Sequence, residues 1–330
     1  MDPITQGTLG ATLSESFSDR DKIKAVSLLG CFAGLSADID VLFQSPSNPL
    51  LFLEYHRQFT HSLIFIPLGA LICAALSWPY AKKHLSFQQA YFSCLLGYAT
   101  HGLLDACTTY GTQLFWPFSD MRVAWNNVSV IDPLFTIPLL TLTVTGVIKR
   151  NPVFARFGLI WAFFYLSLGV IQRDRVVATG IDLAQSRNHT PIRLEAKPGF
   201  GNLVLWKVVY ETDTHFYVDA VRIGLAPKAI PGDRIEKLNL AQHFPWLDPS
   251  SQQARDIERF RWFSNRYLAV DQRFPNRIID VRYSILPNEI KALWAIDLDP
   301  EAAPTAHVKF TTNRKGDRTT MSKLADMMFD

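Results

Sequence analysis

Long apolar runs fill the first half of the chain, and shorter segments of alternating character fill the second half. Five runs approach the roughly 20 residues that a helix needs to cross the hydrocarbon core of a bilayer. They lie at about 23–43, 61–80, 89–107, 130–148 and 155–172. One of them, "HSLIFIPLGALICAALSWPY", contains no Asp, Glu, Lys or Arg. Buried helices of a soluble protein are the alternative, but five such runs within about 150 residues favour membrane spans.

The first residues, "MDPITQGTLGATLSESF", precede these runs and have a different pattern. Leu9, Leu13 and Phe17 recur at helical spacing, which predicts a short amphipathic helix in a re-entrant or interfacial position. The segment has no basic start followed by a long apolar core. A cleavable signal peptide is therefore not expected.

After residue 172 the pattern changes to that of an antiparallel sheet. Segments such as "NLVLWKVVYETDTHFYVDAVRIGL" and "RIIDVRYSIL" are rich in Val, Ile, Tyr and Trp and are separated by Pro, Gly, Asn and Asp. A helix is expected within "DPSSQQARDIERFRWFSNRYL", with Asp248 or Ser250 as its N-cap. The predicted organisation is an α-helical polytopic membrane domain of about five spans at 1–172, followed by a soluble α+β domain with an antiparallel sheet at 173–330.

The distribution of basic residues between the loops predicts an orientation. With five spans, one side holds Arg20, Lys22, Lys24, Lys82, Lys83, Lys149, Arg150 and Arg156, and the other holds Arg57, Arg122, Arg173 and Arg175. Because basic residues favour cytoplasmic loops, the richer side is expected in the cytoplasm. The prediction is a multi-pass bacterial inner-membrane protein with a cytoplasmic N-terminus and a periplasmic C-terminal domain.

Composition and cysteine usage exclude some functions. Charged residues make up 19% of the chain, below the roughly 25% of soluble domains, and the net charge of +3 is too small to indicate a nucleic-acid partner. Cys31, Cys73, Cys94 and Cys107 lack C-x-x-C spacing and all lie in the apolar half. We expect them to pack as small hydrophobic residues, without disulfides or a thiolate zinc site.

Ionisable residues gather at the predicted outer ends of the spans. They are Asp38, Asp40, His56, Arg57, His61, His101, Asp105 and Asp132. His101 and Asp105 are four apart and share a helical face. Regular helix geometry would separate Asp38 from Asp40, and His56 from His61, unless a helix ends there. Asp132 precedes Pro133 and has the sequence of a helix cap.

Imidazole and carboxylate groups in this number predict a metal site, because they are ligands of zinc and related divalent metals. The expected ligands are His61, His101 and Asp105, with Asp40 next. Zinc is favoured as the metal, with manganese and iron as alternatives. Asp38 or His56 would act as a base or supporting ligand, and Arg57 would hold an anionic group of the substrate.

The motifs in the first half also resemble those of a known family, the YdjM-like bacterial inner-membrane proteins, described as membrane-bound metal-dependent hydrolases. The matching stretches are "MDPITQGTLGA", "GLSADIDVL", "HRQFTHSL", "HGLLDACTTYGTQLFWPFSD" and "VIDPLFTIPLL". The resemblance covers about 1–172 and implies a polar signature of Asp38, Asp40, His56, His61, His101 and Asp105. Many members have Thr-His where this chain has Thr5-Gln6, and Gln is a weak metal ligand.

Together these observations favour a metal-dependent hydrolase that acts near the outer leaflet on a lipid-like or amphiphilic ester or phosphoester, with a membrane lipid as the expected partner. One alternative is a non-catalytic scaffold or envelope-stress protein whose polar cluster only joins helices. A second alternative is a transporter or ion pathway, which the lack of inverted repeats disfavours. No protein partner can be named from the sequence.

Overall fold

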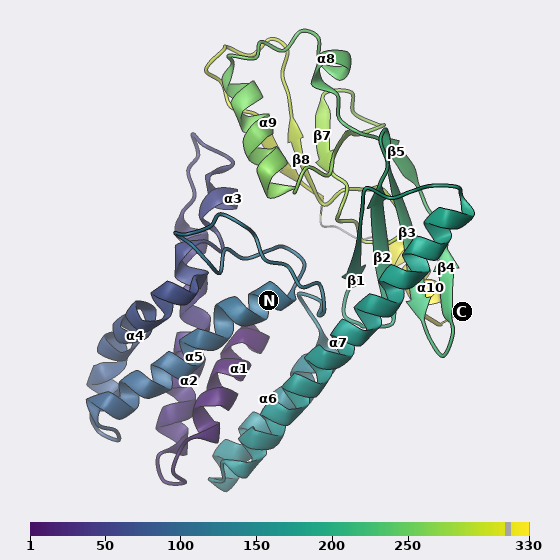
Figure 1. Ribbon diagram of the computed structural model, residues 1–330. Coiled ribbons are helices and arrows are strands. Elements are labelled where there is room, and N and C mark those ends of the chain that lie inside the picture. Colours follow the sequence, from purple (N-terminus) through teal and green to yellow (C-terminus); the bar gives the residue numbers. More distant parts are fainter. Residues whose placement is uncertain (314–317, 330) are drawn as a thin grey trace. The chain divides into compact units, whose positions relative to one another are not determined.

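The computed structural model describes residues 1–313 and 318–329, and its chain divides into two compact units (Figure 1). The first unit contains Met1–Leu42, Tyr55–Ile171 and Phe200–Asn202. The second contains Phe43–Glu54, Gln172–Gly199 and the described residues from Leu203 onward. The boundary predicted near residue 172 lies inside one continuous helix, α7, which runs from Val153 to Ser186.

The first unit is helical. Its elements are α1 (Pro3–Ser16), α2 (Ile23–Ser36), the 3₁₀ turn η1 (Ala37–Leu42), the 3₁₀ turns η2 (Phe59–His61) and η3 (Leu63–Phe65), α4 (Ile66–Ala81), α5 (Phe87–Cys107), α6 (Pro133–Lys149) and the first half of α7. Asp132 caps α6, as predicted, because its carboxylate accepts a hydrogen bond from the backbone N–H of Phe135. The same carboxylate also accepts from the hydroxyl of Tyr165.

Among the described residues, three helical segments are long and apolar enough to cross a membrane: Ile23–Leu42, Leu63–Ala81 and Val153–Ser186. The expected number of five is not confirmed. The helix α5 spans 21 residues, but its mean hydropathy is lowered by side chains such as Gln88, His101 and Asp105. The helix α6 is apolar but has only 17 residues.

Small residues allow the helices of this unit to pack closely. A Cβ atom on Gly10 would lie 2.5 Å from the carbonyl oxygen of Gly30, so α1 and α2 approach each other at backbone distance. The helix α1 forms as predicted, but nearly all its residues are buried and it packs against α2, α5 and α6. An exposed interfacial position is therefore not observed, and the re-entrant position stays a prediction.

The second unit contains two antiparallel sheets. One sheet has the order β1 (Arg193–Pro198), β2 (Leu205–Glu211), β3 (His215–Ile223), β4 (Pro227–Ile230), and β5 (Arg234–Glu236) also pairs with β3. The other has the order β6 (Leu268–Val270), β7 (Arg277–Asp280), β8 (Trp294–Asp297), β9 (Lys309–Thr312). Residues of both sheets, including Val209, Phe216 and Ile279, share one core. The antiparallel pairing predicted after the apolar half is confirmed, but the strands form two sheets where one was expected.

Helices complete this unit. They are α3 (Leu51–Tyr55, of which Tyr55 falls in the first unit), α8 (Leu240–His243), α9 (Gln252–Phe263), α10 (Arg318–Phe329) and the second half of α7. Ser251 caps α9, because its hydroxyl accepts from the N–H of Ala254. The predicted caps are wrong by one to three residues: Asp248 instead accepts from Ser250, so this pair forms a turn before the helix.

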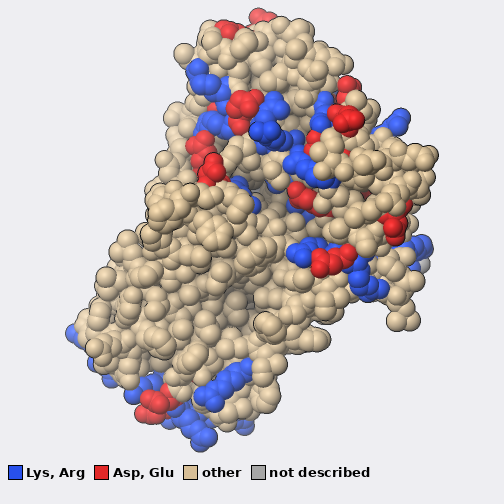
Figure 2. Space-filling view, viewed as in Figure 1, with Lys and Arg blue, Asp and Glu red and all other residues tan. Residues whose placement is uncertain are grey.

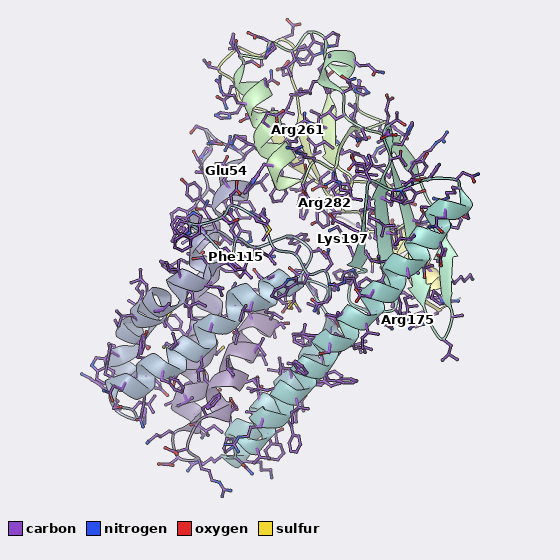
Figure 3. All side chains as sticks on the ribbon, viewed as in Figure 1. Glu54, Phe115, Arg175, Lys197, Arg261 and Arg282 are labelled. Atoms are coloured by element: carbon purple, nitrogen blue, oxygen red, sulfur yellow. The ribbon has the colours of Figure 1, made fainter. Side chains whose placement is uncertain are left out.

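Two ion pairs attach helices to the rest of the second unit. Glu54, labelled in Figure 3, follows Leu53 in α3 and pairs with Arg259 of α9. Near the end of α7, Arg187 makes a two-point contact with the buried carboxylate of Asp219 on β3, with N–O distances of 2.7 and 2.8 Å. Bidentate pairs of this kind fix orientation as well as distance. The second half of α7 is thus anchored on its sheet.

Burial lowers the pKa of Lys207 on β2 to about 7, which predicts an unusual pH dependence of stability. Its ammonium group donates to Ser284 Oγ at 2.7 Å and to the carbonyl of Glu289 at 3.2 Å. Between about pH 7 and the ordinary lysine pKa of 10.5, the unfolded chain binds a proton that the folded chain does not. The free energy of unfolding should therefore rise with pH across this window, by up to about 1.4 kcal/mol per pH unit.

The substitution Lys207→Met should remove this rise, because an apolar side chain of similar length has no proton to lose. Denaturant titrations of both proteins between pH 7 and 10 would measure the difference in slope. Lys291→Met is the matched control, since the Lys291 side chain is 60% exposed. Equal slopes for the parent and the Lys207 variant would show that Lys207 keeps its proton in the folded chain.

Candidate metal centre

Four ionisable side chains converge at one end of the first unit. Asp38 lies on η1 just after α2, His61 ends η2, and His101 and Asp105 lie in the last two turns of α5. The turns α1–α2, α4–α5 and α6–α7 lie at the opposite end, where Lys and Arg gather (Figures 1 and 2). The predicted convergence of residues from three separate segments is present in the structure.

The facing atoms are close to one another. His61 Nε2 lies 3.4 Å from Asp38 Oδ1 and 3.4 Å from Asp105 Oδ2. His101 Nε2 lies 3.3 Å from Asp38 Oδ1 and 3.9 Å from Asp105 Oδ2. All four ligand atoms fall within 4.8 Å of one another. A tetrahedral zinc ion with bonds of about 2.0–2.1 Å has ligand atoms about 3.3–3.4 Å apart, so most of these separations match the edges of such a tetrahedron.

The hydrogen bonding of these residues also fits a metal. His61 Nε2, His101 Nε2 and Asp105 Oδ2 are buried and make no hydrogen bond with the described protein atoms. Buried polar atoms without hydrogen bonds are costly, and a divalent cation would satisfy both imidazoles and add to the ion pair that Asp105 Oδ2 makes with Arg57. Only Asp38 of the four is partly open, with 27% of its side chain exposed. The donor set of two imidazoles and two carboxylates is one that zinc accepts.

The opposite edges of both imidazole rings are held by neighbours. His101 Nδ1 contacts the carbonyl oxygen of Gly34 at 2.6 Å, which requires the ring to donate there. His61 Nδ1 lies 3.1 Å from Asp40 Oδ2 and 3.0 Å from the hydroxyl of Thr60. These contacts leave the Nε2 lone pairs directed into the site. Metal-bound histidines are typically oriented by a carbonyl or carboxylate in this way.

Asp40 lies behind His61, with its carboxylate fully buried. Its Oδ2 accepts hydrogen bonds from the backbone N–H of Arg57 at 3.0 Å and from Thr60 Oγ1 at 2.8 Å. Its Oδ1 lies 2.8 Å from His56 Nδ1. Asp38, Asp40 and His56 form a second group whose ligand atoms are mutually within 4.8 Å. Asp38 therefore belongs to both groups.

Arg57 lies beside Asp105 in the interior. Its guanidinium Nε is 3.0 Å from Asp105 Oδ2, Nη1 donates to Thr108 Oγ1 at 3.0 Å, and its side chain is only 4% exposed. Its backbone φ is 65°, a left-handed conformation that is uncommon outside glycine and often occurs at functional sites. The amino group of Met1 and Gln6 Nε2 both contact the other oxygen, Asp105 Oδ1.

The sequence interpretation found the ionisable side chains of the site but neither the amino group of Met1 nor the neutral partners. Thr60 and the carbonyl of Gly34 hold the two histidines, and Thr108 holds Arg57. Thr and backbone carbonyls are common everywhere in a chain, so nothing in the sequence distinguishes them. Gln6 donates to Asp105 Oδ1 at 2.9 Å, and its Oε1 makes no hydrogen bond with the described protein atoms.

Comparisons with known proteins cover the part of the chain that contains this site. Residues 1–176 match the family described as YdjM inner membrane protein, and they contain every residue of the two groups. The uncharacterized protein YfhP of Bacillus subtilis (strain 168) is 26% identical over 165 residues, which cover 49% of this chain and 50% of that protein. The chain thus matches about half the length of this relative. No solved structure gives a significant match.

Proposed function

The chain belongs to the YdjM inner membrane protein family, and from that premise we propose that it is a membrane-embedded, metal-dependent hydrolase. The observation that supports this most directly is the buried group of ligand atoms on His61, His101 and Asp105 that face Asp38, in which the two imidazole Nε2 atoms make no hydrogen bond with the described protein atoms. When bound there, a divalent cation supplies Lewis-acid chemistry: it polarises a carbonyl or phosphoryl oxygen and lowers the pKa of water. Zinc suits the donor set best.

The residues divide into ligands and supporting groups. We assign Asp38, His61, His101 and Asp105 as ligands, so Asp38 takes the position that the sequence analysis gave to Asp40. Asp40 orients His61 through Nδ1. Asp38 and His56 are the members that solvent reaches, with side-chain exposures of 27% and 22%. Because Asp38 is assigned as a ligand, His56 is the group placed to accept a proton from an attacking water.

Arg57 was predicted to hold an anionic group of the substrate. Because its guanidinium is buried against Asp105 and Thr108, we assign it the role of fixing the Asp105 carboxylate. Its charge also offsets that of Asp105 at short range. A substrate anion would have to enter the interior to reach it.

An amphiphilic substrate fits the surroundings of the open side. Ile39 and Leu42 share the turn η1 with Asp38, and they are 61% and 75% exposed. Apolar side chains beside the reachable carboxylate would contact an acyl or prenyl chain while the polar head meets the site. A lipid-like ester or phosphoester is the substrate class we propose.

The scaffold alternative is favoured by one observation, the ion pair of Asp105 with Arg57, which already compensates one buried charge. Hydrolysis assays separate the two functions. The purified protein in lipid–detergent micelles should hydrolyse members of a panel of amphiphilic esters and phosphoesters, lose that activity after chelation, and recover it with Zn²⁺ or Mn²⁺. Asp105→Asn is expected to lose activity by at least about 100-fold, since even outer partners of ligands contribute roughly 10–100-fold.

In the same assay, Asp326→Asn is the matched control, because Asp326 lies on α10 in the second unit, outside both ligand groups. It should keep the parent activity. Activity of the parent that resists chelation, or an Asp105 variant as active as the parent, would refute metal-dependent hydrolysis at this site.

We propose an orientation in which the basic turns face the cytoplasm and the metal centre faces the opposite side. It is supported by the gathering of Lys and Arg at the end of the first unit that contains the α1–α2, α4–α5 and α6–α7 turns (Figure 2). A reporter enzyme active only outside the cytoplasm should be active when fused after Asp330 and inactive when inserted after Lys149. The reverse pattern would contradict this orientation, and with it the periplasmic position of the second unit.

A further inference from the structure

Two groups of ligands meet at one carboxylate. The first consists of Asp38, His61, His101 and Asp105, and the second of Asp38, Asp40 and His56. The rings of His56 and His61 are 5.9 Å apart between centroids, so the two groups are direct neighbours. We propose that the chain binds two divalent cations, the second held by Asp38, Asp40 and His56, with Asp38 as a bridging ligand. This proposal rests on the metal centre of the proposed function.

The number of protein ligands differs between the two groups and supports a second cation. The first group offers four protein ligands, which would complete a tetrahedral site, and sites of this kind are usually structural. Catalytic zinc sites typically have three protein ligands and leave a position for water or substrate. The second group offers three, so it has the composition that a hydrolytic centre needs.

The side chains of the two groups also differ in their exposure to solvent. His61 and His101 side chains are 0% exposed and that of Asp105 is 1% exposed. Asp38 and His56, which belong to the second group, are 27% and 22% exposed. A cation in the first group would therefore be enclosed by protein, and a cation in the second would be reached by solvent and substrate. The first cation would order the site, and the second would face the substrate.

The arrangement of Asp40 gives the third argument. Three donors fix its Oδ2: the N–H of Arg57, Thr60 Oγ1 and His61 Nδ1. Asp40 Oδ1 lies 2.8 Å from His56 Nδ1 and receives none of these three hydrogen bonds. A cation bound by Oδ1 and His56 would replace the hydrogen bond between them and leave the Oδ2 network intact. Asp40 would then bind one cation and orient a ligand of the other.

A shared carboxylate also suits the usual spacing of two-metal centres, in which the ions lie about 3.5–4 Å apart and clamp the attacking and leaving oxygens of one reaction. Asp38 can give one oxygen to each ion. The substrate class that follows is a phosphoester more than a carboxylic ester, because two cations stabilise the charge that develops on a phosphoryl group.

The test is metal stoichiometry together with electron paramagnetic resonance of the Mn²⁺-loaded protein. After chelation and reloading, the full chain should bind two Mn²⁺ ions and give the spectrum of a spin-coupled pair. His56→Gln should bind one ion and give an uncoupled spectrum. His84→Gln should behave as the parent, because His84 lies in the α4–α5 turn, outside both groups.

The outcomes separate this inference from the function on which it rests. A parent that binds one Mn²⁺ with an uncoupled spectrum, retained in His56→Gln, would overturn the second cation and leave the first site standing. A parent that binds none would overturn both. Because the parent spectrum alone decides between one ion and two, the test does not depend on the folding of the variant.

Discussion

Replacing His101 with Ala is expected to remove the cation of the first group. His101 Nε2 is one of the four facing ligand atoms, and it lies 3.3 Å from Asp38 Oδ1. Three remaining ligands would hold the ion less tightly, and we expect the affinity to fall by at least about 100-fold, more than the roughly 10–100-fold that follows loss of an outer partner. Metal analysis of the purified variant beside the parent measures this directly.

Because His101 is fully buried, His101→Ala also leaves a cavity, and His101→Gln serves as a second variant of closer size. Both should elute as the parent does in size exclusion while they lose metal. His84→Ala is the control that should keep the parent's metal. If both His101 variants were folded and retained stoichiometric metal, the ion would be bound elsewhere in the chain.

The other large effect is expected at Gly97 on α5. A Cβ atom there would lie 2.8 Å from the Cα of Gly30, and closer still to its carbonyl oxygen. Gly97→Val would therefore force α5 away from α2, and overpacking of a close interface typically costs about 1–3 kcal/mol or more. We expect a large loss of folded protein in membranes, measured as the yield of monodisperse protein after extraction.

The same substitution should also disturb the metal centre. Asp38 follows α2, and His101 is four residues beyond Gly97 on α5, so separation of these helices moves ligands apart. Gly224→Ala is the control, because a Cβ there would meet only Ala226 O at 3.7 Å. A Gly97→Val protein with the parent's yield and metal content would show that the helices do not need this close approach.

The parts of the site that follow local rules could be predicted from the sequence. His101 and Asp105 are one helical turn apart and do share a face of α5. The cap at Asp132 follows from its position before Pro133. The strands of the second unit follow from their alternating apolar residues and turn signals, although the division into two sheets does not. Such features depend on residues close together in the chain.

Features that depend on backbone geometry could not be predicted in the same way. Asp38 and Asp40 would diverge on an α-helix, but α2 ends at Ser36 and the 3₁₀ turn η1 carries both carboxylates to the site. His56 and His61 likewise reach it from a turn and a 3₁₀ segment, with Arg57 in a left-handed conformation between them. The exchange of roles that we propose between Asp38 and Asp40 follows from these turns.

The number of membrane spans could not be predicted from hydropathy alone. Hydropathy alone gave five segments, yet α5 carries the ligands His101 and Asp105 and is less apolar for that reason. A helix that contributes buried polar groups to a site can be enclosed by its neighbours, and 12 of the residues in α5, including both ligands, are buried in the first unit. The polar side chains that a site requires therefore lower the hydropathy by which a membrane span is recognised.

The central claim is that the buried ligands hold a metal, and the metal content of the purified parent tests it most directly. The protein should be extracted without chelators, exchanged into metal-free buffer and analysed by mass spectrometry of the elements against protein concentration. We predict a stoichiometric divalent metal, zinc above all, with two ions per chain when the second group is filled. A folded, monodisperse parent that contains no stoichiometric metal and binds none when Zn²⁺ or Mn²⁺ is added would contradict the account and favour a structural role for the cluster.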